Sequence, residues 1–160
     1  MVNVLFVCAG NICRSPIAQG ILEEVIRAEG LETEISVDSA GTGAWHVGEP
    51  PDYRGRDIAK RRGYDLDSQR ARRLDPVDCE KFDYILAMDE ENYRTASALC
   101  RRSDAEVRLL LDYAPDSPVR EVPDPYYSGP EGFDRVLDLV EPAVKGLLDD
   151  IRGRHLSKHV

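Results

Sequence analysis

The sequence predicts a single α/β domain in which a four-stranded parallel sheet is flanked by helices on both faces. Short runs rich in β-branched residues alternate with amphipathic segments of helical period, as in chains built from β-α-β units. The first run, residues 2–7 (VNVLFV), is almost continuously apolar, which is typical of a strand covered on both faces. The chain has 160 residues, the ordinary size of one domain, and we assign residues 1–160 to it.

The first half of the chain predicts a β-α-β unit followed by a short helix. Apolar residues recur at helical spacing up to Gly30, which favours the end of a helix: Ile17, Ala18, Ile21, Leu22, Val25 and Ile26. Residues 34–40 (EISVDSA) are typical of a second strand, and a right-handed crossover places it parallel to the first. Residues 57–62 then predict a short helix that ends at Gly63.

The second half predicts four more elements before a long loop: a helical turn that starts at residues 75–76, a strand over 84–88, a helix from 90 to about 100 and a strand over 107–111. Asp89 suits the N-cap of the helix that follows it. The loop, residues 112–130, contains five prolines and has no regular period.

A last helix is predicted from near Glu131, where an apolar stripe begins. Pro142 lies inside this stripe and removes a backbone donor, so we expect a kink there. We expect residues 152–160 to form a frayed tail, with His155 and His159 as tail residues.

Composition limits the classes of function. The chain has 30 Asp+Glu against 21 Lys+Arg, and its net charge of −9 argues against nucleic acid as the main partner. No signal peptide, membrane-length apolar stretch or lipidation motif is visible, so we expect a soluble cytoplasmic protein that does not bind membranes. Four cysteines without a secretion signal are expected to be reduced thiols rather than a disulfide framework.

The basic residues are concentrated between positions 54 and 73: Arg54, Arg56, Lys60, Arg61, Arg62, Arg70, Arg72 and Arg73. A solvated basic face is the default interpretation. The alternative is that this region steers acidic phosphoprotein substrates toward a pocket.

The stretch from Cys8 to Pro16 (CAGNICRSP) joins the first strand to the first helix. Ser15 suits an N-cap and Pro16 a first helical position, so the segment before them closes against a helix N-terminus, which attracts anions. The dipole, the loop amides and Arg14 favour a Cys8 thiolate, and Arg14 can hold two oxygens of a tetrahedral oxyanion. This combination predicts that Cys8 is a nucleophile that attacks phosphorus. The alternative, that Cys8 and Cys13 are buried core thiols, is the usual state of free cysteines but does not account for the glycine, the arginine and the helix start.

The same stretch resembles the C-x5-R-S phosphate loop of the low-molecular-weight protein tyrosine phosphatases. The motifs that follow it, residues 84–89 (YILAMD) and 124–127 (DPYY), extend the resemblance over nearly the whole chain. It implies a flavodoxin-like (Rossmannoid) sheet with strand order 2-1-3-4. It also implies hydrolysis of phosphotyrosine in proteins, or of small aryl phosphates, through a cysteinyl-phosphate intermediate and without a cofactor. A metal ion is not expected either, because three scattered histidines and no Cys/His cluster leave no ligand spacing.

The resemblance implies roles for individual residues. Cys8 is expected as the nucleophile, Arg14 as the phosphate clamp and Asp124 as the general acid. Phosphate, a similar oxyanion or the substrate is expected to contact Ala9, Gly10, Asn11, Ile12, Cys13, Ser15, Trp45, Tyr126 and Tyr127. Ser15 is a candidate donor to the Cys8 sulfur, and Cys8 and Cys13 are expected to form a protective reversible disulfide.

Several residues near these motifs have other interpretations or depart from the family pattern. Trp45 is expected as a pocket wall rather than as core, and His46 as a solvated loop residue. The family places an acidic residue at Asp89, which could orient substrate or loop in addition to capping its helix. Gln69 stands where the family commonly has a histidine that braces the loop asparagine, which puts the support of Asn11 in doubt.

Three alternative functions remain open at this point. An arsenate reductase would need Cys79 or Cys100 to form a disulfide with the nucleophile. A protein-arginine phosphatase of the same fold resembles this loop but carries threonine where this chain has Ile12. A non-catalytic phosphate-binding module would keep the phosphate loop without the chemistry.

Overall fold

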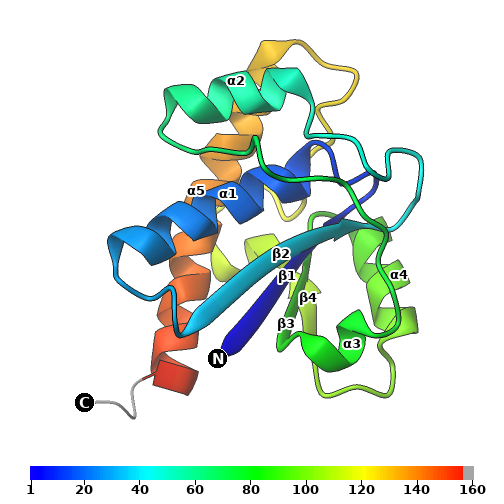
Figure 1. Cartoon of the computed structure of the whole chain (residues 1–160), viewed down its shortest axis with the longest axis vertical. Coiled ribbons are helices and arrows are strands. Elements are labelled where there is room, and N and C mark those ends of the chain that lie inside the picture. The colour runs from blue at the N-terminus through cyan, green and yellow to red at the C-terminus, as the bar shows by residue number, and fades with distance from the viewer. Residues whose placement is uncertain (157–160) are drawn as a thin grey trace.

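Residues 1–156 are described by the structure, a computed structural model, and within them one parallel sheet has the strand order β2-β1-β3-β4 (Figure 1). The elements are β1 (Val2–Cys8), α1 (Arg14–Ala28), β2 (Ile35–Gly41), α2 (Tyr53–Arg61), α3 (Asp78–Lys81), β3 (Tyr84–Ala87), α4 (Glu90–Leu99), β4 (Glu106–Leu109), the 3-10 helix η1 (Leu110–Tyr113), α5 (Pro130–Ile151) and the π-helix η2 (Arg152–Leu156). The predicted α/β class and strand order are confirmed.

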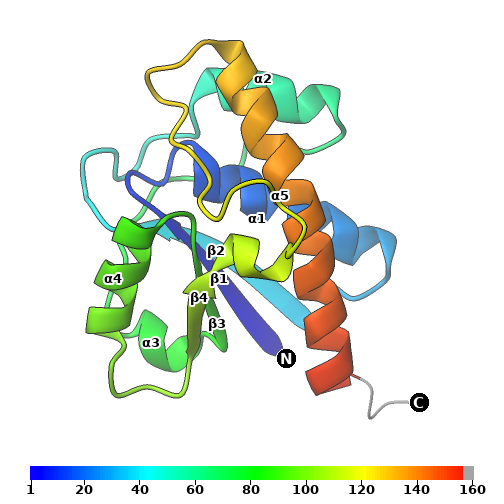
Figure 2. The same ribbon diagram turned by 180° about the vertical axis from the view of Figure 1, so that it is seen from behind.

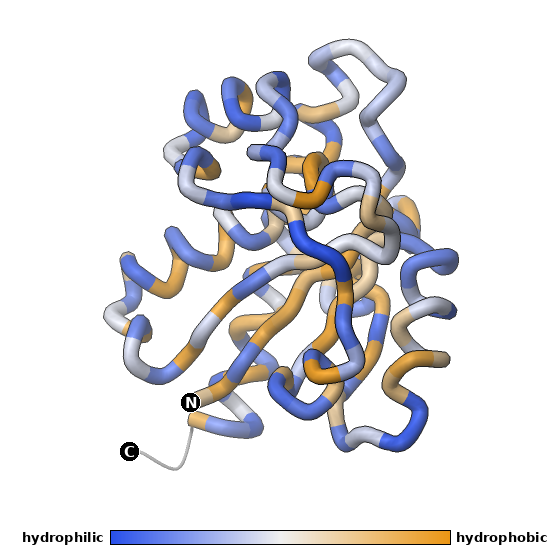
Figure 3. The backbone as a smooth tube through the Cα atoms, turned by 45° about the vertical axis from the view of Figure 1, so that its right-hand side comes forward, coloured by the Kyte–Doolittle hydropathy of each residue, from blue (hydrophilic) through white to orange (hydrophobic). Residues whose placement is uncertain are grey.

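Helices cover both faces of the sheet, as predicted (Figures 1 and 2). Successive side chains of β1 point to opposite faces. Val4, Phe6 and Cys8 join the larger core with α1 and α5, whereas Leu5 and Val7 join a smaller core with α3 and α4. Because β1 is buried on both sides, its sequence is apolar at nearly every position, and the central strands are hydrophobic in Figure 3.

The parallel arrangement brings distant segments to one edge of the sheet. Cys8, the last residue of β1, is in register with Gly41 at the end of β2, and Ala87 at the end of β3 pairs with Val7. The segments that follow β1 and β3 therefore leave the sheet side by side. This is the edge at which open α/β sheets bind their ligands.

Two predicted helix starts are wrong, the first by two residues and the second by four. The first helix begins at Arg14, with Cys13 at its N-cap, so Ser15 and Pro16 lie inside the first turn. Ser15 does not cap because its hydroxyl contacts Cys8 and Asn11 instead. The second helix begins at Tyr53 rather than at residue 57, because the Asp52 side chain caps it by accepting a hydrogen bond from the Arg54 N–H.

The later elements also differ from the predictions at their ends. β4 stops at Leu109, and Leu110 and Leu111 belong to η1, since a short apolar run does not distinguish strand from helical turn. Helix α5 continues through Pro142 as one element, and the kink expected there stays a prediction. The predicted frayed tail is instead helical as far as Leu156, and His159 lies outside the described residues.

The expectation that all four cysteines are reduced is wrong for two of them. Cys79 on α3 and Cys100 at the C-cap of α4 form a disulfide with a Cα–Cα distance of 5.2 Å. Both are buried in the smaller core. The two cysteines are 21 positions apart in the sequence. The fold brings them together because α3 precedes β3 and α4 follows it on the same face of the sheet.

We expect this disulfide to stabilise the protein. Closing a loop of this length lowers the entropy of the unfolded chain and contributes about 3 kcal/mol, or roughly 6 to 12 °C in Tm. Thermal unfolding with and without dithiothreitol measures this contribution. The Cys79→Ala/Cys100→Ala variant is the control, because its Tm should already be low and should not respond to the reductant. An unchanged wild-type Tm in reductant would contradict the prediction.

No helix of the described chain is long and apolar enough to cross a membrane.

Candidate active site

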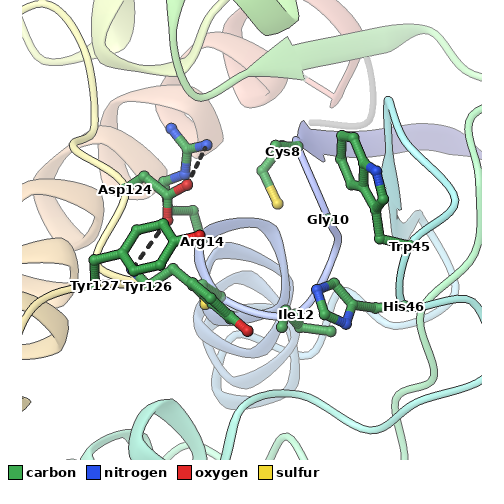
Figure 4. Close-up of a pocket in the computed structure, with 11 residues that line it drawn as sticks. Cys8, Gly10, Ile12, Arg14, Trp45, His46, Asp124, Tyr126 and Tyr127 are labelled. Atoms are coloured by element: carbon green, nitrogen blue, oxygen red, sulfur yellow. Dashed lines mark hydrogen bonds and ion pairs between the residues drawn. The ribbon is translucent and has the colours of Figure 1, made fainter.

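A cavity of about 320 Å³ opens at the carboxyl edge of β1 (Figure 4). It is lined by Cys8, Ala9, Gly10, Ile12, Cys13, Arg14, Trp45, His46, Asp124, Tyr126 and Tyr127. Two predicted site residues, Asn11 and Ser15, lie behind this surface and support it. His46 is an addition: it was expected to be a solvated loop residue, but it lines the cavity, with Nδ1 3.1 Å from the Glu49 carboxylate.

The loop between β1 and α1 is held in shape by the Asn11 side chain. Asn11 has a positive φ of 59°, a left-handed conformation that asparagine tolerates better than most residues. Its Nδ2 donates to Ser15 Oγ at 2.8 Å and to Ser39 Oγ at 2.9 Å, and its Oδ1 accepts from the Arg72 backbone N–H at 3.0 Å. The Asn11 side chain therefore holds the shape of the loop through three partners.

Gln69 does not take part in this network. Its Nε2 donates to the backbone oxygen of Pro16 at 3.0 Å, while its Oε1 is buried without a hydrogen-bond partner. The support of Asn11 comes instead from Ser39 on β2 and from the backbone at Arg72. The departure from the family pattern at position 69 thus leaves the loop braced by other residues.

The Cys8 sulfur has one polar partner among the described side chains, Ser15 Oγ at 3.0 Å. Because this oxygen already accepts a hydrogen bond from Asn11, its own hydrogen is available to the sulfur. Cys13 is buried as well, and burial raises the pKa of its thiol well above the usual range, with nearby Asp52 adding to the effect. Both cysteines are free thiols, and the protective disulfide between them stays a prediction.

Arg14 is almost fully buried and is anchored by two partners. Its guanidinium donates to Asp89 Oδ2 at 2.6 Å and to the Val122 carbonyl at 3.0 Å. Burial lowers the pKa of Arg14, but the charge of Cys8 and the hydrogen bond to Asp89 outweigh it, so the net pKa is raised. Asp89 also caps α4 through a hydrogen bond from the Asn92 N–H, so it both caps a helix and orients the arginine.

The loop before α5 places Asp124 beside the same arginine. Asp124 Oδ2 lies 3.7 Å from an Arg14 nitrogen, and its Oδ1 accepts a hydrogen bond from the Tyr126 N–H at 3.1 Å. The side chain is 50% exposed, so it can reach both the cavity and solvent.

Aromatic rings stand on opposite sides of the cavity. Tyr126 and Tyr127 lie on the side of Asp124, edge to face with ring centroids 4.9 Å apart, while Trp45 and His46 lie across from them (Figure 4). Ile12 lies between the two sides. Trp45 is 71% exposed and Tyr127 95% exposed, so neither is a core residue and both remain available to a ligand.

The basic region between residues 54 and 73 is largely neutralised. Arg56, Arg61, Arg62 and Arg72 each form an ion pair with a neighbouring carboxylate. Arg62 alone contacts three acidic side chains of α5, at distances of 2.7 to 2.9 Å. This pairing favours a structural role for the region over the steering of acidic substrates.

The part of the chain that the structure describes contains no group of three or more metal-ligating side chains. The functional groups of the cavity are a thiol, a buried guanidinium, a carboxyl group and the loop amides. Together they can bind a tetrahedral oxyanion, supply a nucleophile and transfer a proton.

Comparison with known proteins gives a consistent result. The profile of the family described as low molecular weight phosphotyrosine protein phosphatase matches residues 3–158. A low molecular weight protein-tyrosine-phosphatase of Bacillus subtilis, YfkJ, is 42% identical over 95% of this chain and 97% of its own.

Two solved structures are informative. The protein tyrosine phosphatase of Entamoeba histolytica, crystallised with Hepes in the active site, superposes with a TM-score of 0.91 at 38% identity, covering 96% of this chain and 98% of its own. A Drosophila arginine phosphatase superposes with a TM-score of 0.86 at 32% identity, covering 93% of this chain and 97% of its own.

Proposed function

Since the chain belongs to the low molecular weight phosphotyrosine protein phosphatases and is therefore an enzyme that acts on phosphorylated substrates, we propose that it hydrolyses phosphotyrosine with Cys8, Arg14 and Asp124 as its catalytic residues. The observation that carries this proposal is the meeting of these three side chains in one cavity. Release of inorganic phosphate from a phosphotyrosine peptide in the presence of a metal chelator tests it.

In the first step, the Cys8 thiolate attacks phosphorus, an Sγ–P bond forms and the bond to the phenolic oxygen breaks. Arg14 and the N–H groups of the loop hold the equatorial oxygens, on which negative charge is spread. Asp124 gives its proton to the departing phenolate. The Asp89 and Val122 contacts keep the guanidinium in place, so little reorganisation is needed during the reaction.

In the second step, water attacks the cysteinyl phosphate and Asp124 takes a proton from it. An oxygen–phosphorus bond forms, the Sγ–P bond breaks and Cys8 leaves as thiolate. The hydroxyl of Ser15, 3.0 Å from the sulfur, donates a hydrogen bond to this leaving group. The products are a tyrosine hydroxyl and inorganic phosphate.

The structure disfavours the arsenate reductase alternative. Cys79 and Cys100 are bonded to each other in the smaller core, whereas Cys8 belongs to the larger core on the other face of the sheet. Neither distal cysteine is placed to resolve a disulfide with Cys8. The binding-module alternative is disfavoured because nucleophile, clamp and acid all line one cavity.

The arginine phosphatase alternative depends on the cavity wall, because a Drosophila arginine phosphatase shares the fold. Ile12, a residue of the phosphate loop, presents apolar surface to the cavity, which suits a phenyl ring and leaves a guanidinium without a hydrogen-bond partner. The aromatic walls add stacking energy on the order of 1 kcal/mol for an aryl group. We therefore propose phosphotyrosine as the preferred substrate over phosphoarginine and phosphoserine.

Replacing Ile12 with threonine should shift this preference toward phosphoarginine. A hydroxyl at this position can bond to the guanidinium or to the attacking water, and we expect the ratio of kcat/KM values for matched peptides to change by about 10-fold. Ile12→Val is the matched control, because valine has the shape of threonine without the hydroxyl. A wild-type preference for phosphoarginine, or the same shift in both variants, would contradict the role of the wall.

A further inference from the structure

Arg54, at the second position of α2, does not line the cavity but connects two of its walls. Its guanidinium donates to the carbonyl of Ser128 and to the carbonyl of Tyr126, each at 2.9 Å. Both carbonyls belong to the loop that carries Asp124. Figures 1 and 2 show the start of α2 beside this loop.

The other side of the Arg54 guanidinium is held by Asp52. Nε donates to Asp52 Oδ1 at 3.0 Å and a terminal nitrogen donates to Oδ2 at 2.9 Å, a two-point contact that only the arginine fork can form. The backbone N–H of Asp52 donates to the carbonyl of Ile12 at 2.8 Å. Through this pair, the loop with Asp124 is tied to the phosphate loop.

Packing adds to the hydrogen bonds. Phe133 lies near the start of α5, and the centre of its ring is 4.8 Å from the Arg54 guanidinium. The centre of the Tyr126 ring is 6.0 Å from the same guanidinium. The Asp52 and Arg54 side chains are 11% and 23% exposed, so solvent competes little for the contact between these two residues. The Arg54 guanidinium is thus held by Asp52, by the two loop carbonyls and by the Phe133 ring.

The loop is fixed on both sides of Asp124. On the N-terminal side, the Val122 carbonyl accepts from Arg14 and the Val122 N–H donates to the Met88 carbonyl. On the C-terminal side, Arg54 holds the Tyr126 carbonyl, and the N–H of the same residue donates to Asp124 Oδ1. Holding residue 126 therefore also holds the Asp124 carboxyl group.

We propose that Arg54 is a positioning residue for the general acid: it sets the place of the Asp124 carboxyl group relative to the leaving oxygen. The inference rests on the proposed role of Asp124 as the acid. The side-chain hydrogen bonds of Arg54 go to Asp52, Tyr126 and Ser128, so its removal should affect proton transfer more than phosphate binding.

The test is a leaving-group series of aryl phosphates with the Arg54→Met variant. Methionine keeps an apolar stem against Phe133 but has no donors for the loop carbonyls. We expect kcat/KM to fall by roughly 10- to 100-fold for poor leaving groups and by less than about 3-fold for good ones, because a displaced acid matters only where the leaving group needs a proton. Competitive inhibition by inorganic phosphate should not change.

Arg61→Met is the matched control, since Arg61 lies on the same helix and its one polar side-chain contact within residues 1–156 is an exposed ion pair with Asp57. Arg54→Lys keeps the charge without the two-point fork and should fall between wild type and Arg54→Met. The Tm of each variant shows whether it is folded at the assay temperature.

The same substitution in an Asp124→Ala background separates the proposal from its premise. If Arg54 acts through Asp124, adding Arg54→Met to Asp124→Ala should not lower kcat/KM any further for substrates with poor leaving groups. An equal loss across the series in Arg54→Met, or a further loss in the double variant, would overturn the proposal. A flat series in Asp124→Ala alone would instead overturn the acid role and, with it, this inference.

Discussion

Replacement of Cys8 by serine should abolish phosphate release, lowering kcat by at least about 10⁴-fold. A serine hydroxyl is a much weaker nucleophile at neutral pH than a cysteine thiolate. The fold should survive, because the hydrogen bond between the Cys8 sulfur and the Ser15 hydroxyl is one that an oxygen can also make. Phosphate binding should survive as well, because the loop amides and Arg14 are unchanged.

The measurement is hydrolysis of an aryl phosphate in the presence of a metal chelator, together with binding of inorganic phosphate by calorimetry. The Cys79→Ala/Cys100→Ala variant is the control for loss of cysteines as such, because its two substitutions lie in the other core of the sheet. It should turn over substrate at a temperature where it is folded. Substantial activity in Cys8→Ser would refute the cysteinyl-phosphate mechanism.

Replacement of Asp124 by alanine should lower kcat/KM by about 10²- to 10⁴-fold for aryl phosphates with poor leaving groups. Hydrolysis of substrates with good leaving groups should be much less affected. The reason is that a nitrophenolate departs without a proton, whereas an unsubstituted phenolate does not. Asp124→Asn should behave in the same way, since an amide can still accept from the Tyr126 N–H but gives no proton to the leaving oxygen. The comparison uses kcat/KM across a series of aryl phosphates.

Asp116→Ala is a suitable control for this series, because Asp116 is an exposed residue of the same proline-rich loop and lies outside the cavity. It should match wild type for every substrate. If the loss in Asp124→Ala is equal for all leaving groups, Asp124 is not the acid, and another group near the cavity must supply the proton.

The elements of the sheet and the phosphate loop could be predicted from the sequence because both produce local patterns, whereas the strand order was implied by the family resemblance. A strand with apolar residues at nearly every position must be covered on both faces, and the helix that follows it must cross to a parallel neighbour. Cys8 and Arg14 are six positions apart in one loop, so the short chain between them limits their separation. Element ends were less predictable: Ser15 caps nothing, because the loop uses its hydroxyl for Asn11 and Cys8.

The distant groups that support the site residues became visible only in the three-dimensional structure. Val122, whose carbonyl anchors Arg14, is 108 positions from it, and no periodicity links the two. No local pattern predicts that Cys79 pairs with Cys100 either. The same is true of the support of Asn11, which comes from Ser39 and the Arg72 backbone rather than from Gln69, and of the contacts of Arg54. These contacts form because the carboxyl ends of parallel strands meet at one edge of the sheet, where segments far apart in the chain pack against each other.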